Sequence, residues 1–173
     1  MARITIVDKD DNVIGAEERD VVRTKGLRHR IVRVFAVNAD GKVLLHKRSG
    51  DLKDTPGKWD QSVGGHVDKG EDYLTAAKRE TSEELGIKVD EFISLGKFYV
   101  ERPAPGGMVR RFQTVFRCNW NGPVKYDRAE IAEVKWFSID EIDTWLGKSP
   151  EDFTKNFGPA FSLLKQDLRR KSS

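Results

Sequence analysis

The stretch of sequence that decides the fold, residues 65–87, reads GHVDKGEDYLTAAKRETSEELGI. Apolar or small side chains recur in it at spacings of three and four residues: Leu74, Ala77, Thr81 and Leu85. At about 100° per residue, this spacing places all four on one face of a helix. A glycine follows directly, and glycine there commonly ends a helix in a left-handed cap. The pattern therefore predicts a helix with one buried face.

Three glutamates of this predicted helix, Glu80, Glu83 and Glu84, share a second face, about a quarter turn from the apolar one. Like charges at these spacings repel each other, so the cluster favours a positive group beside it. Clustered carboxylate oxygens suit Mg²⁺ or Mn²⁺, whereas zinc prefers nitrogen and sulfur ligands. Glutamate is also a good helix former, so the three residues alone leave a merely solvated face open.

The spacing of the whole segment resembles the Nudix box, G-x5-E-x7-R-E-U-x-E-E-x-G-U, in which U is a bulky apolar residue. Its fixed positions are matched by Gly65, Glu71, Arg79, Glu80, Glu83, Glu84 and Gly86. The one departure is Thr81, which stands where an aliphatic residue is usual. Because Thr81 lies on the apolar face, the departure concerns local packing rather than chemistry.

The resemblance to the Nudix family implies an α/β (α+β) fold, an α/β/α sandwich with a mixed β-sheet. It also implies hydrolysis of a diphosphate linkage with Mg²⁺, or Mn²⁺, as cofactor. Matched residue by residue, the metal ligands would be Glu80, Glu83, Glu84 and the carbonyl of Gly65. Glu71 and Arg79 would hold the loop to the helix and orient Glu80, and Gly86 would be structural.

The general base of the reaction is left open by this resemblance, because family members differ in it. Glu80 is one candidate. The others are the acidic residues of a later loop: Asp127, Glu130 and Glu133.

A second resemblance, to the isopentenyl-diphosphate isomerase-like branch of the family, covers residues 26–29, 44–49, 56–60 and 65–67. True isomerases have a catalytic cysteine where this chain has Gly64. Two glutamates of the isomerases would fall near Val109 and Arg111. We therefore expect a hydrolase, with isopentenyl-diphosphate isomerase and a non-catalytic nucleotide-binding module as the alternatives.

Substrate contacts are predicted from basic and aromatic side chains. His29, Arg33 and Phe35 alternate onto one face of a predicted strand, and Arg48, His66 and Arg111 complete the expected set. Further phosphate contacts could come from Lys47, Arg102 or Arg110. The resemblance also leaves open whether His29 and His66 bind metal. Nucleoside di- or triphosphates, nucleotide sugars and isoprenoid diphosphates all remain candidate substrates.

The remaining sequence predicts one domain over 1–173, with a core of about 29–147, an N-terminal hairpin of about 3–16 and a C-terminal helix of about 159–168. Predicted strands lie at 31–37, 43–45, 61–63, 92–101, 109–119 and 134–137. A second helix is predicted to open at Ser138 with a capping box to Glu141.

Composition sets the broad class of protein. Hydrophobic residues make up 38% and charged residues 34% of 173 residues, which indicates a soluble globular protein. No apolar run approaches the roughly 20 residues needed to span a bilayer, and the N-terminus lacks a signal-peptide pattern.

The single Cys118 suits a reducing cytosol and a buried core position, so we expect a cytoplasmic protein. The net charge of +3 is too small to indicate a nucleic-acid partner. Homodimers are common in the family.

Overall fold

A mixed β-sheet of nine strands and four α-helices make up the computed structural model, which describes residues 2–172. The strands are β1 (Ile4–Val7), β2 (Val13–Glu17), β3 (Arg28–Val37), β4 (Val43–Arg48), β5 (Trp59–Asp60), β6 (Val63–His66), β7 (Ile93–Ala104), β8 (Gly107–Asn119) and β9 (Ile131–Phe137). The helices are α1 (Arg19–Lys25), α2 (Tyr73–Leu85), α3 (Ile139–Lys148) and α4 (Phe157–Ser172), with a 3₁₀ turn at Pro150–Asp152. No helix in this described part is long and apolar enough to cross a membrane.

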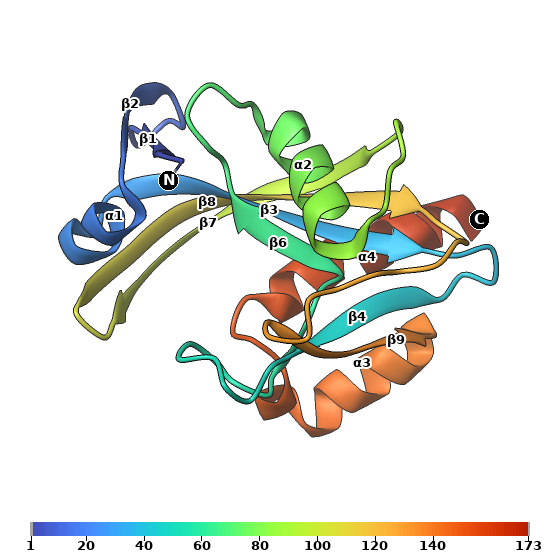
Figure 1. The fold of residues 1–173 in the computed structure, drawn as a ribbon. Helices are drawn as coiled ribbons and strands as arrows, with labels where there is room; N and C mark the ends of the chain where they lie inside the picture. The colour runs from blue at the N-terminus through green and yellow to red at the C-terminus, as the bar shows by residue number, and fades with distance from the viewer. Residues whose placement is uncertain (1, 173) are drawn as a thin grey trace.

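The sheet branches at β3, its central strand (Figure 1). β3 pairs antiparallel with β6 and parallel with β8, from Arg28 opposite Arg110 to Val37 opposite Asn119. The predicted hairpin between β3 and β4 exists at its turn, but the strands pair only at Val37 and Val43. β4 turns away to pair with β9 instead. The expected mixed sheet is thus confirmed.

Alternate residues of β3 face helices on the two sides of the sheet. Val32 and Val34 pack into one core cluster with Ala76 and Ala77 of α2. On the opposite face, Phe35 joins a second cluster with α3 and α4. A strand buried on both faces is expected to be mostly apolar, and in β3 residues 31–37 are apolar apart from Arg33. The layers form the predicted α/β/α sandwich (Figure 1).

Local signals at the ends of α2 place the acidic face. The Asp72 side chain caps the first turn by accepting a hydrogen bond from the Thr75 amide at 2.7 Å. Gly86 ends the helix in the left-handed conformation, with φ of 67°. Thr81 is fully buried, and its hydroxyl donates to the Ala77 carbonyl at 2.6 Å. This hydrogen bond explains how a polar side chain is tolerated on the apolar face.

Several elements differ from the sequence expectations. The helix α1 was not predicted; it is short, and ends at Gly26 with φ of 61°. The C-terminal helix α4 is longer than the predicted 159–168. The predicted capping box of α3, between Ser138 and Glu141, is confirmed.

One buried carboxylate joins the N-terminal hairpin to three other elements, in addition to the pairing of β1 with β3. Asp11 is 8% exposed and accepts hydrogen bonds from Arg30 at 2.7 Å, Tyr73 at 2.8 Å and Lys97 at 2.8 Å. These three donors come from β3, α2 and β7. Burial alone would raise the pKa of Asp11, but hydrogen bonds from Lys97, Arg30 and Tyr73 outweigh it and hold the pKa below its ordinary value.

We expect Asp11→Asn to lower the free energy of unfolding at pH 7 by about 3 kcal/mol, because it leaves the largely buried Arg30 guanidinium without its charge partner. A carboxylate with a lowered pKa stabilises the fold above its unfolded pKa, and this stabilisation is lost as the pH falls through the lowered value. The difference from wild type should therefore shrink below about pH 4. Urea denaturation at pH 7 and pH 3 measures it, with the exposed Asp10→Asn as control. Equal midpoints for Asp11→Asn and wild type at pH 7 would contradict this role.

Candidate active site

Arg79 ties the loop before α2 to the acidic face of the helix. Its Nε and Nη2 donate to the Glu71 carboxylate at 2.7 and 2.9 Å, and Nη2 also donates to the His66 carbonyl at 3.1 Å. Its Nη1 donates to Glu80 at 2.9 Å and to Glu83 at 3.3 Å. One guanidinium thus fixes the loop, the helix and the Glu80 carboxylate relative to each other, which the expected orienting role requires.

Glu80 and Glu84 stand one helical turn apart and are largely buried. Burial raises the pKa of Glu84 to about 9, and the charges of Glu80 and Glu130 add to the rise, while a hydrogen bond from the Gly64 backbone opposes it. Burial also raises the pKa of Glu80, although Arg79 acts against it. Buried carboxylates this close together favour a cation between them.

Glycine is required at position 65 because Glu80 lies over it. A Cβ atom added to Gly65 would stand 2.4 Å from Oε1 of Glu80. The backbone of β6 at Gly65 and the Glu80 carboxylate are therefore in contact, which places β6 beside the acidic face of α2.

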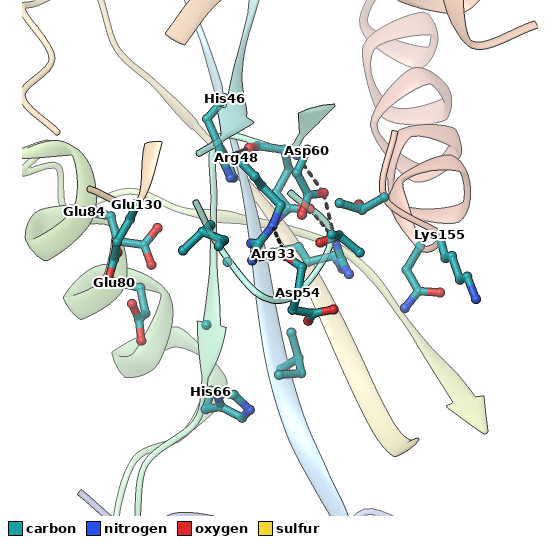
Figure 2. Close-up of a pocket in the computed structure, with 18 of the residues that line it drawn as sticks. Arg33, His46, Arg48, Asp54, Asp60, His66, Glu80, Glu84, Glu130 and Lys155 are labelled. Carbon is teal, nitrogen blue, oxygen red and sulfur yellow. Dashed lines mark hydrogen bonds and ion pairs between the residues drawn. The ribbon is translucent and has the colours of Figure 1, made fainter. Parts of the chain in front are cut away.

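Two cavities meet at this acidic cluster and share Glu80, Glu84 and Glu130. The smaller, of about 300 Å³, is acidic and is lined by Glu80, Glu83, Glu84, Asp127, Glu130 and Ile131. The larger, of about 580 Å³, carries basic side chains on its other walls: Arg19, Arg33, Arg48, Arg102, Arg111 and Lys155. Figure 2 shows the three glutamates on one side of this cavity and Lys155 on the other. The site thus has an acidic and a basic side.

The acidic side fits a hard divalent cation by the chemistry of its donors, since all are carboxylate or carbonyl oxygens. Burial, together with the charges of Glu80 and Glu130, raises the pKa of Glu84 to about 9, so a bound cation would favour the ionised form of this carboxylate. Within residues 2–172, no three acidic, histidine or cysteine side chains already stand in metal-binding geometry. Two of the carboxylates, Glu80 and Glu83, are instead hydrogen-bonded to Arg79.

The predicted site residues divide into those that line the cavities and those that do not. The larger cavity is lined by Gly65, Glu80, Glu84, Arg33, Arg48, His66, Arg102 and Arg111, and Glu83 lines the smaller one. Among the candidates for general base, Asp127 and Glu130 line a cavity. Glu133 instead pairs with Lys47 between β9 and β4, and neither residue lines the two cavities. Arg110 also lies outside them, where it donates to the Gly26 carbonyl at 2.8 Å.

Phe35 is not a substrate contact in this structure. It shares a face of β3 with Arg33, but its side chain is fully buried, and its ring packs edge-on against Phe157 of α4 with 6.2 Å between centroids. Strand alternation placed both residues on one face correctly. The helix α4 covers only the end that carries Phe35, so Phe35 is removed from the candidate set.

His29 is a supporting residue rather than a wall of the cavity. It is 7% exposed, its Nδ1 hydrogen-bonds the Leu27 carbonyl at 2.9 Å, and its ring stacks on His66 at 5.5 Å. Burial lowers the pKa of His29 to about 4 and that of His66 to about 3, where the charge of Arg19 adds to the effect. Both rings are therefore neutral at pH 7, and of the two only His66 lines the larger cavity.

Some residues at the larger cavity were not predicted from the sequence. Asp60 forms an ion pair with the buried Arg33 at 3.1 Å, and Gln61 and Gln113 complete the hydrogen bonds of this guanidinium. Arg19, Asp54 and Lys155 come from α1 and from two loops far apart in the chain. Asp60 pairs with His46 across β5 and β4, but β5 has only two residues, which is too short for a sequence pattern to predict this pairing.

Cys118 lies in the core, away from both cavities. It is 1% exposed, and burial raises the pKa of its thiol to about 12. We expect native protein to resist iodoacetamide, and Cys118→Ala to lower the free energy of unfolding by about 1 kcal/mol without a change in activity. Mass spectrometry of native and urea-unfolded protein measures the alkylation. Rapid alkylation of native protein, or an inactive but folded variant, would contradict the core assignment.

Comparison with known proteins identifies the class to which this fold and this acidic helix belong. Residues 27–157 match the family model for the NUDIX domain. The chain therefore belongs to the Nudix hydrolase family.

Individual relatives agree with this membership. An uncharacterized Nudix hydrolase of Yersinia pestis is 37% identical over 160 residues, covering 92% of this chain and 84% of the relative. An isopentenyl-diphosphate Delta-isomerase of Serratia proteamaculans is 29% identical over 152 residues, covering 87% and 84%. A crystal structure of a Deinococcus radiodurans protein matches with a TM-score of 0.72 at 24% identity, covering 94% and 98%, and shows the fold alone.

Proposed function

We propose that this chain is a metal-dependent hydrolase that cleaves a diphosphate linkage in a nucleoside diphosphate derivative or a similar small phosphorylated metabolite. The observation that carries the proposal is the buried pair Glu80 and Glu84 at one end of a cavity whose other walls are basic. Diphosphate hydrolysis needs an acidic cluster to hold a cation and basic groups to hold phosphate oxygens. Both are present in one cavity, which we propose belongs to a single domain.

The residues of the acidic side would hold Mg²⁺, or Mn²⁺, through the carboxylates of Glu80, Glu83 and Glu84 and the carbonyl of Gly65. When bound, such a cation neutralises diphosphate charge and makes water a stronger acid. Arg79 orients Glu80 through the hydrogen bond at 2.9 Å. The basic side chains of the larger cavity would bind and position the substrate.

Three acidic residues of the cavities are candidates to take the proton of the attacking water. Glu130 lines both cavities and has no hydrogen bond from another side chain among the described residues. Glu80 also lines both, but Arg79 holds its carboxylate. We therefore put Glu130 beside Glu80 as candidate base, with Asp127 as a third residue at the smaller cavity.

Substrate phosphates would be held on the basic side. Arg48 lines the larger cavity, with its guanidinium positioned by two hydrogen bonds to the Asp54 carbonyl, at 3.1 and 2.9 Å. Arg33 also lines this cavity, but its buried guanidinium is paired with Asp60, so it supports the cavity wall rather than supplying an unpaired positive charge. His66, neutral at pH 7, can donate or accept a hydrogen bond there.

The isomerase alternative is favoured by the 29% identical relative. Isomerisation of a carbon skeleton requires an acid and a base at the substrate carbon atoms. Gly64 and Arg111 stand where the isomerase pattern has its cysteine and a glutamate. The chain's own cysteine, Cys118, is buried in β8 and lines neither cavity. A non-catalytic nucleotide-binding module would have no need of the full acidic cluster, which is intact here.

The deciding experiment measures phosphate and monophosphate release from nucleoside diphosphates, nucleoside triphosphates, nucleotide sugars and isopentenyl diphosphate. Each reaction is run with Mg²⁺ and with EDTA. We expect hydrolysis of at least one compound with Mg²⁺ and none with EDTA. Conversion of isopentenyl to dimethylallyl diphosphate without hydrolysis would establish the isomerase, and tight nucleotide binding without any turnover would establish the binding module.

A further inference from the structure

Two arginines in the wall of the larger cavity, Arg102 of β7 and Arg111 of β8, make no side-chain hydrogen bond or ion pair within residues 2–172. The Nε atom of each is fully buried and has no partner. Other arginines with a buried guanidinium pair with carboxylates: Arg30 with Asp11 at 2.7 Å, Arg33 with Asp60 at 3.1 Å and Arg117 with Asp167 at 2.5 Å. Arg102 and Arg111 therefore differ from the arginines that stabilise this fold.

The two side chains stand on the same face of the sheet. Arg111 lies opposite Val100 and Arg102 opposite Val109, so the two arginines are diagonal neighbours on adjacent strands. Burial lowers the pKa of Arg111 to about 10, and the charges of Arg33 and Arg102 add to the effect, while Asp60 and Asp54 oppose it. Positive charges collected in a cavity wall without contacting carboxylates cost stability unless an anion binds them.

The distance from the acidic side identifies which part of a substrate would reach these arginines. In the order β6, β3, β8 and β7, Arg111 is two strands and Arg102 three strands from Gly65, over which the Glu80 carboxylate lies. At about 4.8 Å per strand, the strands that carry Arg111 and Arg102 lie about 10 and 14 Å from β6 across the sheet. Because Gly65 aligns with Val32 and Thr114, the two arginines are also displaced from Gly65 along the strands. A group bound by the two arginines is therefore separate from a diphosphate bound at Glu80 and Glu84.

We propose that Arg102 and Arg111 form a subsite for a phosphate monoester group that the substrate carries beyond its scissile diphosphate linkage. The proposal rests on the proposed hydrolase function of the same cavity. Two guanidinium forks present parallel N–H donors that match phosphate oxygens. Two uncompensated positive charges balance a dianionic phosphate monoester, whereas a carboxylate would balance only one.

The subsite is tested first without catalysis, by calorimetric titration of inorganic phosphate into the protein in EDTA. We expect Arg111→Met and Arg102→Met each to weaken phosphate binding about tenfold. The control Arg23→Met removes the same charge from the exposed face of α1, and should change binding less than about twofold. Equal weakening by all three variants would mean general charge attraction and would overturn the subsite.

The second test uses pairs of compounds that differ by one phosphate, with Mg²⁺ present. NADP⁺ and NAD⁺ differ by a phosphate monoester on the 2′-oxygen of a ribose, and 3′-phospho-ADP and ADP differ by a phosphate monoester on the 3′-oxygen. We expect kcat/KM to favour the more phosphorylated member of one pair at least about tenfold, and the preferred pair identifies the source of the group. Arg111→Met should move that ratio close to one, mainly through KM. A ratio that survives in both arginine variants, or no preference in either pair, would overturn the proposal.

Stability separates a binding role from a structural one. Because the two guanidinium groups lack partners, Arg111→Met should raise the midpoint of thermal unfolding, whereas removal of a structural arginine lowers it. Arg111→Lys, which keeps the charge but loses the planar fork, provides a second variant if Arg111→Met does not fold, and should bind phosphate more weakly than wild type.

Arginine-dependent phosphate binding without any hydrolysis would refute the hydrolase and leave the subsite standing. Hydrolysis without phosphate binding or pair preference would refute the subsite and leave the hydrolase standing.

Discussion

Glu84→Gln will lower kcat at least about a thousandfold, because a carboxylate that holds a catalytic cation contributes several kcal/mol to the transition state. The midpoint of thermal unfolding should stay close to that of wild type. The pKa of Glu84 is raised to about 9, mainly by burial, so the side chain is neutral at pH 7 before a cation binds, as glutamine always is. The measurement is kcat on the best substrate of the panel, together with the midpoint of thermal unfolding in EDTA.

A matched control for this variant is Glu91→Gln, which changes an exposed glutamate outside both cavities. Its activity should equal that of wild type. Mn²⁺ affinity, measured by titration calorimetry, should fall in Glu84→Gln and not in the control. Near-normal turnover by folded Glu84→Gln would refute the assignment of the acidic cluster as the cation site.

Gly65→Ala will lower kcat about a hundredfold, since small displacements of a catalytic group have effects of this size. The added Cβ would stand 2.4 Å from Oε1 of Glu80, so the carboxylate must move. Gly65 is not in the left-handed region, and its backbone accepts alanine. We therefore expect almost unchanged stability with the loss of activity, measured as kcat against urea midpoint.

Two further variants show whether Gly65→Ala acts through Glu80. Gly50→Ala is the control, because an added Cβ there has no atom within 4 Å and its φ is not positive. In a double-mutant cycle, Gly65→Ala should cost far less activity in a Glu80→Gln background than in wild type. Additive losses would mean that the new methyl group disturbs something other than Glu80.

Features determined by neighbouring residues could be predicted from the sequence. The helix α2, its glycine cap and the spacing of Glu80, Glu83 and Glu84 depend on contacts within a few turns, and periodicity reveals such contacts. The capping box of Ser138 and Glu141 is local in the same way. The short α1 has too few residues for a periodic signal, and was not predicted.

Features determined by distant segments could not be predicted. Alternation places Arg33 and Phe35 on one face of β3, but the position of α4 decides that only Arg33 reaches the cavity. The separation of β3 from β4 depends likewise on β6, β8 and β9 as competing partners. Arg102 and Arg111 become neighbours only through the register of β7 and β8.

The parallel pairing of β3 with β8 has a consequence for how substrate length can change during evolution. Both sides of the cavity are attached to β3, the acidic one through β6 and the basic one through β8. A slip of one residue in either pairing would turn every inward side chain outward, so selection cannot adjust the span between the two sides by small steps of the backbone. Shorter or longer substrates would instead be accommodated by exchanging side chains such as arginine and lysine at fixed positions. Relatives with different substrates should therefore differ in those side chains while keeping the same strand register.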